Sequence, residues 1–212
     1  MEFIDPAIEE YSRAFSDPES TLLKELDRET HAMILQPRML SGHLQGRFLS
    51  FLSKIHRPKL ILEIGTYTGY SALCLAEGLV PEGKIITLDV NEELETFTRS
   101  FFVRSEFASK IDYRIADAKH EIPSISGPFD FVFIDADKRN YALYFDLVIE
   151  KMNPGGIILV DNVLWSGKIV DVKAQDKSTQ ALRDFNQKCL DDARVEKVLL
   201  PLRDGLLMLR VI

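Results

Sequence analysis

Charged and amide side chains directly follow two apolar runs of this 212-residue chain, FDFVFI and GGIILV. They are Asp135, Asp137 and Lys138 after the first run, and Asp161 and Asn162 after the second. If the runs are neighbouring parallel strands, their ends lie about 5 Å apart, so Asp135, Asp161 and Asn162 can converge. Three oxygen ligands suit a hard cation, Mg²⁺ first and Mn²⁺ or Ca²⁺ as alternatives. The pattern therefore favours a divalent-metal centre, although each acid taken alone is better explained by structure, Asp161 by a chain turn and Asp135 by a helix cap.

Two further side chains lie close to this predicted centre. Lys138 would stand beside the cation as a general base, although a solvated lysine at a helix start is the plainer interpretation. Trp165, the only tryptophan, follows in VLWSGK and is explained equally by core packing and by a flat wall beside a planar substrate. The histidines are scattered and do not suggest a zinc site; they are His31, His43, His56 and His120.

A third group of candidates lies in the loop LEIGTYTGYS. Glu63 and Gly65 end an apolar run and Gly69 opens a helical pattern, so backbone and helix N–H groups can approach a ligand, although a glycine here often marks only a turn. Asp89, which ends the next run, suits the two hydroxyls of a ribose in either a nicotinamide or an S-adenosylmethionine (SAM) protein. The loop lacks the phosphate-binding G-x-G-x-x-G pattern, and SAM has no phosphates, so the loop favours SAM.

The third apolar run ends in Ala116-Asp117-Ala118. Small residues and a carboxylate could flank an adenine ring. A helix cap by Asp117 explains the same residues equally well.

Short apolar runs alternate with helical segments from residue 59 onward, after a helical region at about 1–55. The runs are 59–65, 84–90, 111–117, 129–135 and 155–161, and the helices are 69–79, 91–107, 119–122, 140–152 and 180–190. This alternation predicts a parallel sheet covered on both faces. The last two runs, 195–202 and 206–212, flank Asp204-Gly205 and predict an antiparallel hairpin. The fold class is therefore α/β, a doubly wound Rossmann-like methyltransferase fold with a mostly parallel seven-stranded sheet.

Composition narrows the class of protein. A net charge of −7 disfavours nucleic-acid and anionic-membrane binding, which need a positive field. Cys74 and Cys189 form no paired motif and are expected to be buried thiols. The length of 212 residues leads us to expect one domain, 1–212. Because neither a signal peptide nor a run of about 20 apolar residues is visible, we expect the protein in the cytoplasm. Residues of about 1–55 would be helices covering the site, and Asp17 is available as the cap of the helix that starts near Pro18.

Five blocks of the sequence together resemble the cation-dependent small-molecule O-methyltransferases, the caffeoyl-CoA and catechol O-methyltransferase family. The blocks are LEIGTYTGYSAL, LDVNEE, FDFVFIDADKRNY, GGIILVDNVLWSG and LPLRDGLLMLRVI, in that order. The resemblance begins at about Met39. It implies methyl transfer from SAM to a hydroxyl of a small phenolic or vicinal-diol acceptor held on a divalent cation, and it implies a homodimer.

The resemblance also implies roles for single residues. The metal ligands match Asp135, Asp161 and Asn162, the catalytic residues are Asp135 and Lys138, and Trp165 is the candidate substrate contact. The donor contacts match Met39, Ser41, Glu63, Gly65, Thr66, Tyr67, Ser71, Asp89, Ala118 and Asp137. Gln45, where many relatives carry glutamate, and the short stretch after Trp165 depart from the family pattern and argue against a coenzyme A thioester as acceptor.

Three alternatives stay open from the sequence. A methyltransferase acting on another acceptor such as RNA would keep the donor site, but the Asn/Asp-Pro-Pro-aromatic motif of base methylation is replaced here by DADK. A nicotinamide oxidoreductase would lack the hairpin, and a non-catalytic ligand-binding relative has no need of the metal-and-lysine set.

Overall fold

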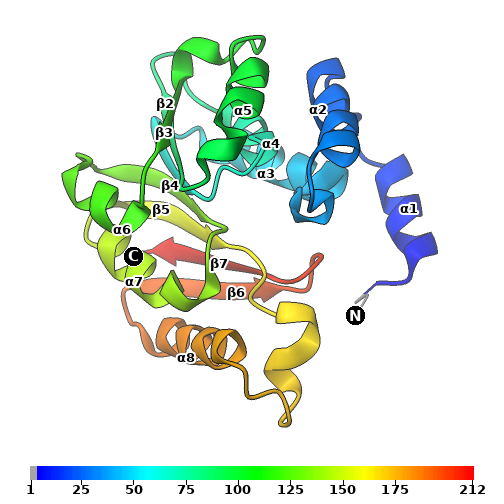
Figure 1. Cartoon of the computed structure of the whole chain (residues 1–212). Helices are drawn as coiled ribbons and strands as arrows, with labels where there is room; N and C mark the ends of the chain where they lie inside the picture. The colour runs from blue at the N-terminus through cyan, green and yellow to red at the C-terminus, as the bar shows by residue number, and fades with distance from the viewer. Residues whose placement is uncertain (1–3) are drawn as a thin grey trace.

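One sheet of seven strands forms the centre of the chain, in a computed structural model that describes residues 4–212 (Figure 1). The first three residues of the predicted domain 1–212 lie outside the described part. The strands are β1 (Leu60–Ile64), β2 (Lys84–Asp89), β3 (Ile111–Ile115), β4 (Phe129–Ile134), β5 (Met152–Val160), β6 (Val195–Leu200) and β7 (Leu206–Val211). Their order is β3-β2-β1-β4-β5-β7-β6, parallel except for β7, which runs antiparallel to both neighbours. This confirms the predicted fold class.

Helices cover both faces of the sheet, as the buried strands require. On one face lie α2 (Thr21–Met33), α3 (Gly42–His56), α4 (Tyr70–Ala76) and α5 (Glu95–Phe102), and on the other α6 (Ala118–Glu121), α7 (Tyr141–Ile149) and α8 (Lys177–Asp191). Alternate residues of β1 point to opposite faces of the sheet. Ile61 packs on the face of α2–α5, and Leu62 and Ile64 pack on the face of α6–α8. The expected alternation of strand and helix is confirmed.

The helices before β1 agree with the prediction except at one cap. The side chain of Ser20, not Asp17, caps α2 by accepting a hydrogen bond from Leu23 N at 3.2 Å. The physical reason is position, because Ser20 immediately precedes the first helical residue. Helix α1 (Pro6–Ala14) lies at the outer side of this layer, and each of its residues is at least partly exposed (Figure 1). The division at about residue 55 stays a prediction.

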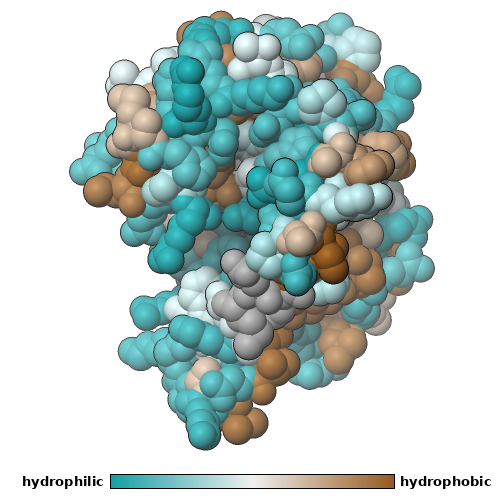
Figure 2. Space-filling model, turned by 90° about the vertical axis from the view of Figure 1, so that its right-hand side faces the viewer, coloured by the Kyte–Doolittle hydropathy of each residue, from teal (hydrophilic) through white to brown (hydrophobic). Residues whose placement is uncertain are grey.

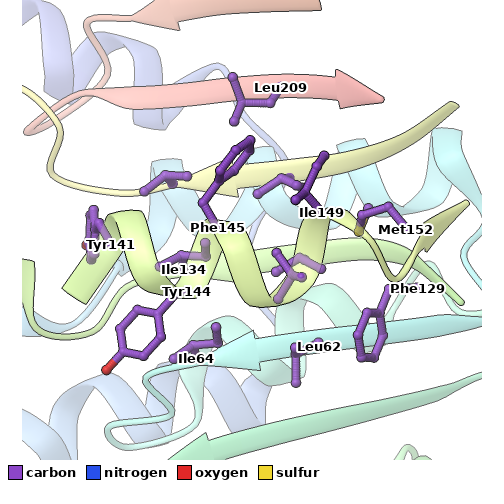
Figure 3. Packing of buried hydrophobic residues seen from close by; sticks show 14 of the residues in the cluster. Leu62, Ile64, Phe129, Ile134, Tyr141, Tyr144, Phe145, Ile149, Met152 and Leu209 are labelled. Atoms are coloured by element: carbon purple, nitrogen blue, oxygen red, sulfur yellow. The ribbon is translucent and has the colours of Figure 1, made fainter. Parts of the chain in front are cut away.

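Helix α7 anchors the end of the sheet that carries the candidate residues. Its side chains Phe145 and Val148 are fully buried against the sheet, and Tyr141 and Tyr144 lie at the end where Ile64 and Ile134 finish β1 and β4 (Figure 3). A short 3₁₀ segment, η5 (Lys138–Asn140), joins β4 to this helix. The packing therefore fixes the position from which Lys138 extends.

The assumption behind the predicted metal centre is that β4 and β5 are parallel neighbours, and they are. Ile134 pairs with Val160, so Asp135 and Asp161 follow at the same level of the sheet. Asp161 N donates to Ile134 O at 3.0 Å, and Asp135 N donates to Ile64 O at 2.8 Å. Within residues 4–212, no helix has the length and apolar character needed to cross a membrane.

Candidate active site

A cavity of about 1770 Å³ opens at the carboxyl ends of the parallel strands, where ligands bind in sheets of this kind. Eleven predicted site residues line it: Met39, Gly65, Tyr67, Asp89, Ala118, Asp135, Asp137, Lys138, Asp161, Asn162 and Trp165. The buried residues Ser41, Glu63, Thr66 and Ser71 are not part of its lining. Ligand pockets commonly hold about 300–1000 Å³, so this cavity has room for two small molecules. Figure 2 views the molecule from this end, where hydrophilic side chains dominate the surface.

Asp161 is the most buried acid of the predicted metal centre, with 2% of its surface exposed. Its Oδ2 accepts a hydrogen bond from Gln45 Nε2 at 2.7 Å, and its Oδ1 accepts one from the backbone N of Asn162 at 2.7 Å. Burial, and then the negative charge of Asp135, raise the pKa of Asp161 above its ordinary value. Asn162 adopts a left-handed backbone conformation, φ 59°, which asparagine tolerates better than most residues.

The chemistry of this donor set fits a hard divalent cation. Two carboxylates and one side-chain amide line the same wall, and the described residues contain no group of three or more His, Cys, Asp or Glu side chains that competes as a metal site. Burial, and then repulsion by the charge of Asp135, raise the pKa of Asp161 and disfavour its ionised form in the bare protein. A divalent cation would remove this repulsion, and oxygen ligands are those that Mg²⁺ prefers.

Lys138 lies between Asp135 and a buried tyrosine, Tyr141. Its Nζ donates to Asp135 Oδ1 at 3.0 Å and to the Tyr141 hydroxyl at 2.7 Å, and that hydroxyl donates to Asp161 O at 2.9 Å. Only 12% of the Lys138 side chain is exposed, so it is not the solvated helix-start lysine of the plainer interpretation. Burial, and then the charge of Asp135, raise the pKa of Tyr141, which keeps it a neutral donor.

On the donor side, Asp89 is held in place by the backbone. Its Oδ2 accepts from Tyr67 N at 2.6 Å and its Oδ1 accepts from Asn91 N at 2.9 Å, while each oxygen keeps a further lone pair for a ligand. Asp137 is held similarly, with Oδ2 accepting from the Tyr144 hydroxyl and Oδ1 from Asn140 Nδ2, each at 2.7 Å. Asp117 caps α6 by accepting from Lys119 N at 3.0 Å, so the cap interpretation of that acid is confirmed.

Gly65 brings the loop after β1 against Asp135, a residue of the predicted metal centre. Its φ is 103°, a left-handed conformation that side chains rarely adopt, and a Cβ at this position would lie 2.0 Å from the backbone oxygen of Asp135. The loop after β1 and the end of β4 are therefore in direct backbone contact. Only glycine permits this approach.

Trp165 lies in the loop of residues 162–167, which is named the metal loop after the predicted ligand Asn162 and in which four residues have a positive φ. Trp165, Ser166 and Gly167 have φ values of 50°, 53° and 77° within η6 (Trp165–Val170). Trp165 packs against the core, as the first interpretation requires, and it also lines the cavity, so its role as a wall beside a substrate stays a prediction. Its Nε1 is buried without a hydrogen-bond partner among residues 4–212.

Sequence reasoning missed four residues that complete the site: Tyr141, Tyr144, Arg203 and Asp204. Tyr141 lies three residues after Lys138, and the same helical spacing could have suggested the pair. No local sequence pattern marks Arg203 as a site residue, because its hydrogen-bond partners lie more than 150 positions earlier in the chain. Gln45 was noted only as a departure from a family pattern. The structure shows it fully buried against Asp161, so its identity bears on the predicted metal centre.

Glu63 gives a testable pH dependence. It is fully buried and accepts from Thr87 Oγ1 at 2.5 Å, and burial raises its pKa to about 8. Between about 4.5 and about 8 the folded protein holds a proton that the unfolded chain has released, so stability falls as pH rises, by about 1.4 kcal/mol per pH unit. Glu63→Gln removes this titration, and we expect a flatter stability profile from pH 5 to 8, measured by urea unfolding of the ligand-free protein. Exposed Glu196→Gln is the control, and profiles of equal slope in wild type and Glu63→Gln would contradict the assignment.

The sheet order and the donor-side loop define the class of protein, a class I SAM-dependent methyltransferase. The family model described as O-methyltransferase matches residues 11–212, and the chain belongs to this family. It is 37% identical over 207 residues to caffeoyl-CoA O-methyltransferase 1 of Arabidopsis thaliana, covering 92% of this chain and 78% of that protein. It is 35% identical over 167 residues to the mouse catechol O-methyltransferase domain-containing protein 1, covering 76% of this chain and 64% of that protein.

A solved structure extends the likeness to three dimensions. The O-methyltransferase from Bacillus cereus in complex with SAH, the demethylated form of SAM, superposes with a TM-score of 0.90 at 32% identity, covering 97% of each chain. The protein is therefore a SAM-dependent O-methyltransferase of the caffeoyl-CoA and catechol type. The nicotinamide and non-catalytic alternatives are set aside by this membership.

Proposed function

We propose that the protein methylates one hydroxyl of a small phenolic acceptor with neighbouring hydroxyls, held on a divalent cation, most simply Mg²⁺. One observation carries the proposal: Asp135, Asp161, Asn162 and Lys138 line one cavity together with the donor-side residues Gly65 and Asp89. An acceptor bound near the acids therefore lies within the same space as the donor. The acceptor's identity and which of its hydroxyls reacts are left to experiment.

The residues divide the work between binding and proton transfer. Asp135, Asp161 and Asn162 would hold the cation, whose positive charge favours the ionised form of a neighbouring hydroxyl. Lys138 Nζ, held by Asp135 and Tyr141, takes the hydroxyl proton. The oxygen forms its bond to the methyl carbon as the carbon–sulfur bond of SAM breaks, leaving SAH.

The orientation of donor and acceptor would account for much of the rate enhancement that proton transfer does not supply. The Gly65 loop and Asp89 would place the donor, and the Trp165 ring would bound a planar acceptor. Holding two reactants in line can contribute about 7–11 kcal/mol toward the barrier. The rigid backbone contacts around Gly65 and Asp89 suit this role.

A radiolabel assay tests the proposal. Labelled SAM with Mg²⁺ is offered to catechol, caffeate, caffeoyl-CoA, a flavonoid and an RNA. We expect transfer to at least one catechol-type acceptor, loss of transfer in EDTA, and recovery on adding Mg²⁺. Undiminished transfer in EDTA would reject the metal role, and transfer to RNA alone would reject the acceptor class.

We also propose a homodimer in the cytoplasm. Both expectations rest on the family resemblance and the composition, and light scattering after gel filtration tests the first of them.

A further inference from the structure

The turn between β6 and β7, Arg203-Asp204-Gly205, contacts two separate walls of the cavity. One wall is the metal loop (Asn162–Gly167), and the other is the cover segment, defined here as residues 36–41, which includes η1 (Pro37–Met39). Both walls contain predicted ligand contacts, Asn162 and Trp165 in the first and Met39 and Ser41 in the second. The turn is therefore placed to connect metal and donor.

Asp204 and Gly205 hold the metal loop. Leu164 N donates to Asp204 O at 2.9 Å, and Val163 N donates to Gly205 O at 3.1 Å. The Asp204 carboxylate accepts a further hydrogen bond from Ser166 N. These bonds fix the loop immediately after Asn162, and the bond to Ser166 N holds a residue whose backbone is left-handed.

Arg203 holds the cover segment. Its guanidinium donates to Ser41 O and, at 3.4 Å, to Arg38 O. The same segment is tied to the donor loop, because the Tyr67 hydroxyl donates to Gln36 O at 3.0 Å. A donor molecule that contacts Tyr67 and Met39 would therefore influence where the cover segment places the carbonyls that Arg203 binds.

Gln45 connects Arg203 to Asp161. Its Oε1 accepts from Arg203 Nη1 at 3.4 Å, its Nε2 donates to Asp161 Oδ2 at 2.7 Å, and its side chain is fully buried. A guanidinium only donates, so Arg203 requires the amide oxygen of Gln45 to face it. The amide nitrogen then faces Asp161, which is the orientation that a carboxylate needs.

We propose that Arg203 is a positioning residue that couples donor binding under the cover segment to cation binding at Asp161. The inference rests on the metal centre of the proposed function. An ordered cover segment favours the Arg203 position that orients Gln45, and Gln45 in turn orients Asp161. Two ligands that favour one arrangement bind cooperatively, and each must raise the affinity of the other by the same factor.

The backbone of Arg203 supplies a variant that is expected to fold. Its φ is 49°, in the left-handed region that favours glycine. Arg203→Gly therefore removes the side chain without straining the turn. Arg203→Met keeps the length of the side chain, and Arg210→Met is its matched control, because Arg210 lies on β7 of the same hairpin and pairs with Glu196 at the surface.

Calorimetry of Mn²⁺ with and without SAH, and of SAH with and without Mn²⁺, measures the coupling. In wild type and Arg210→Met we expect each ligand to lower the dissociation constant of the other by 5-fold or more, within the usual range of coupling between sites. In Arg203→Gly and Arg203→Met we expect the factor to fall toward 1, and in Arg203→Lys to recover in part. A variant that only destabilises the fold weakens the binding of both ligands. The factor by which each ligand raises the affinity of the other then stays the same.

The outcomes separate this inference from the proposed function. Wild-type coupling retained in both Arg203→Gly and Arg203→Met would overturn the role of Arg203 and leave the metal centre intact. Mn²⁺ and SAH that bind wild type independently would overturn the coupling in the same way. Failure of wild type to bind Mn²⁺ at all would overturn the metal centre and the coupling with it.

Discussion

Asp161→Asn is expected to reduce Mn²⁺ affinity by at least about 100-fold, and methyl transfer with it, while the metal-free protein stays folded. Replacing a ligand should cost no less than replacing one of its hydrogen-bond partners, which typically costs 10–100-fold. The amide cannot accept at both of the Asp161 positions that now bind Gln45 Nε2 and Asn162 N, so one hydrogen bond is lost. The loss is offset because the amide no longer places a second charge beside Asp135. We therefore expect a metal-free stability within about 1 kcal/mol of wild type.

Three measurements check this expectation. Free Mn²⁺ is followed by electron paramagnetic resonance, unfolding by urea after EDTA treatment, and activity by the radiolabel assay. Asp146→Asn is the matched control, because that acid is half-exposed on α7 and pairs with Lys188. Mn²⁺ binding of wild-type strength in Asp161→Asn would remove Asp161 from the metal centre.

Lys138→Met is expected to lower kcat by about 10²–10⁴-fold, the usual contribution of a positioned general base. Methionine keeps much of the side-chain length but cannot take a proton or donate to Asp135 and Tyr141. SAH affinity should change little, because Lys138 has no contact with the loop around Gly65 and Asp89 among the hydrogen bonds of the described residues.

The pH profile of kcat distinguishes a base from a structural contact. We expect the pH profile of kcat to change in Lys138→Met, with SAH affinity measured by calorimetry as the folding control. Lys188→Met, which removes an exposed lysine of α8, should leave rate and profile unchanged. A Lys138→Met enzyme with the rate and profile of wild type would exclude Lys138 as the base.

Features that depend on local pattern were predictable from the sequence. Apolar runs of strand length bounded by helices fix the parallel sheet, and Asp204-Gly205 between two such runs fixes the hairpin. The convergence of Asp135 and Asp161 followed from one assumption, that β4 and β5 are neighbours, and their register satisfies it. The cap of α2 was misassigned to Asp17 because two polar residues, Asp17 and Ser20, both precede that helix, and one turn of backbone decides between them.

Features that depend on distant segments were not predictable. Gln45 and Asp161 are 116 positions apart, and Arg203 and Ser41 are 162 apart, so no spacing rule brings them together. Gln45 illustrates the difficulty, because the sequence shows only that a polar residue replaces a common glutamate. Its burial and its two hydrogen bonds determine what the residue does. Tyr141 lies in the apolar core pattern of α7, where its hydroxyl is invisible to periodicity.

The contact between Gly65 and the Asp135 carbonyl has a consequence for how such an enzyme diverges. Donor loop and metal side meet through main chain alone, at a position where even a methyl group would lie 2.0 Å from an oxygen. In the proposed function, the distance between the donor methyl group and the acceptor oxygen would thus be set by main-chain packing at the sheet ends. In the proposed function, the wall beside the acceptor would come instead from the η6 loop, which contains Trp165. New acceptors could therefore be acquired by exchanging this loop while the transfer distance is inherited unchanged.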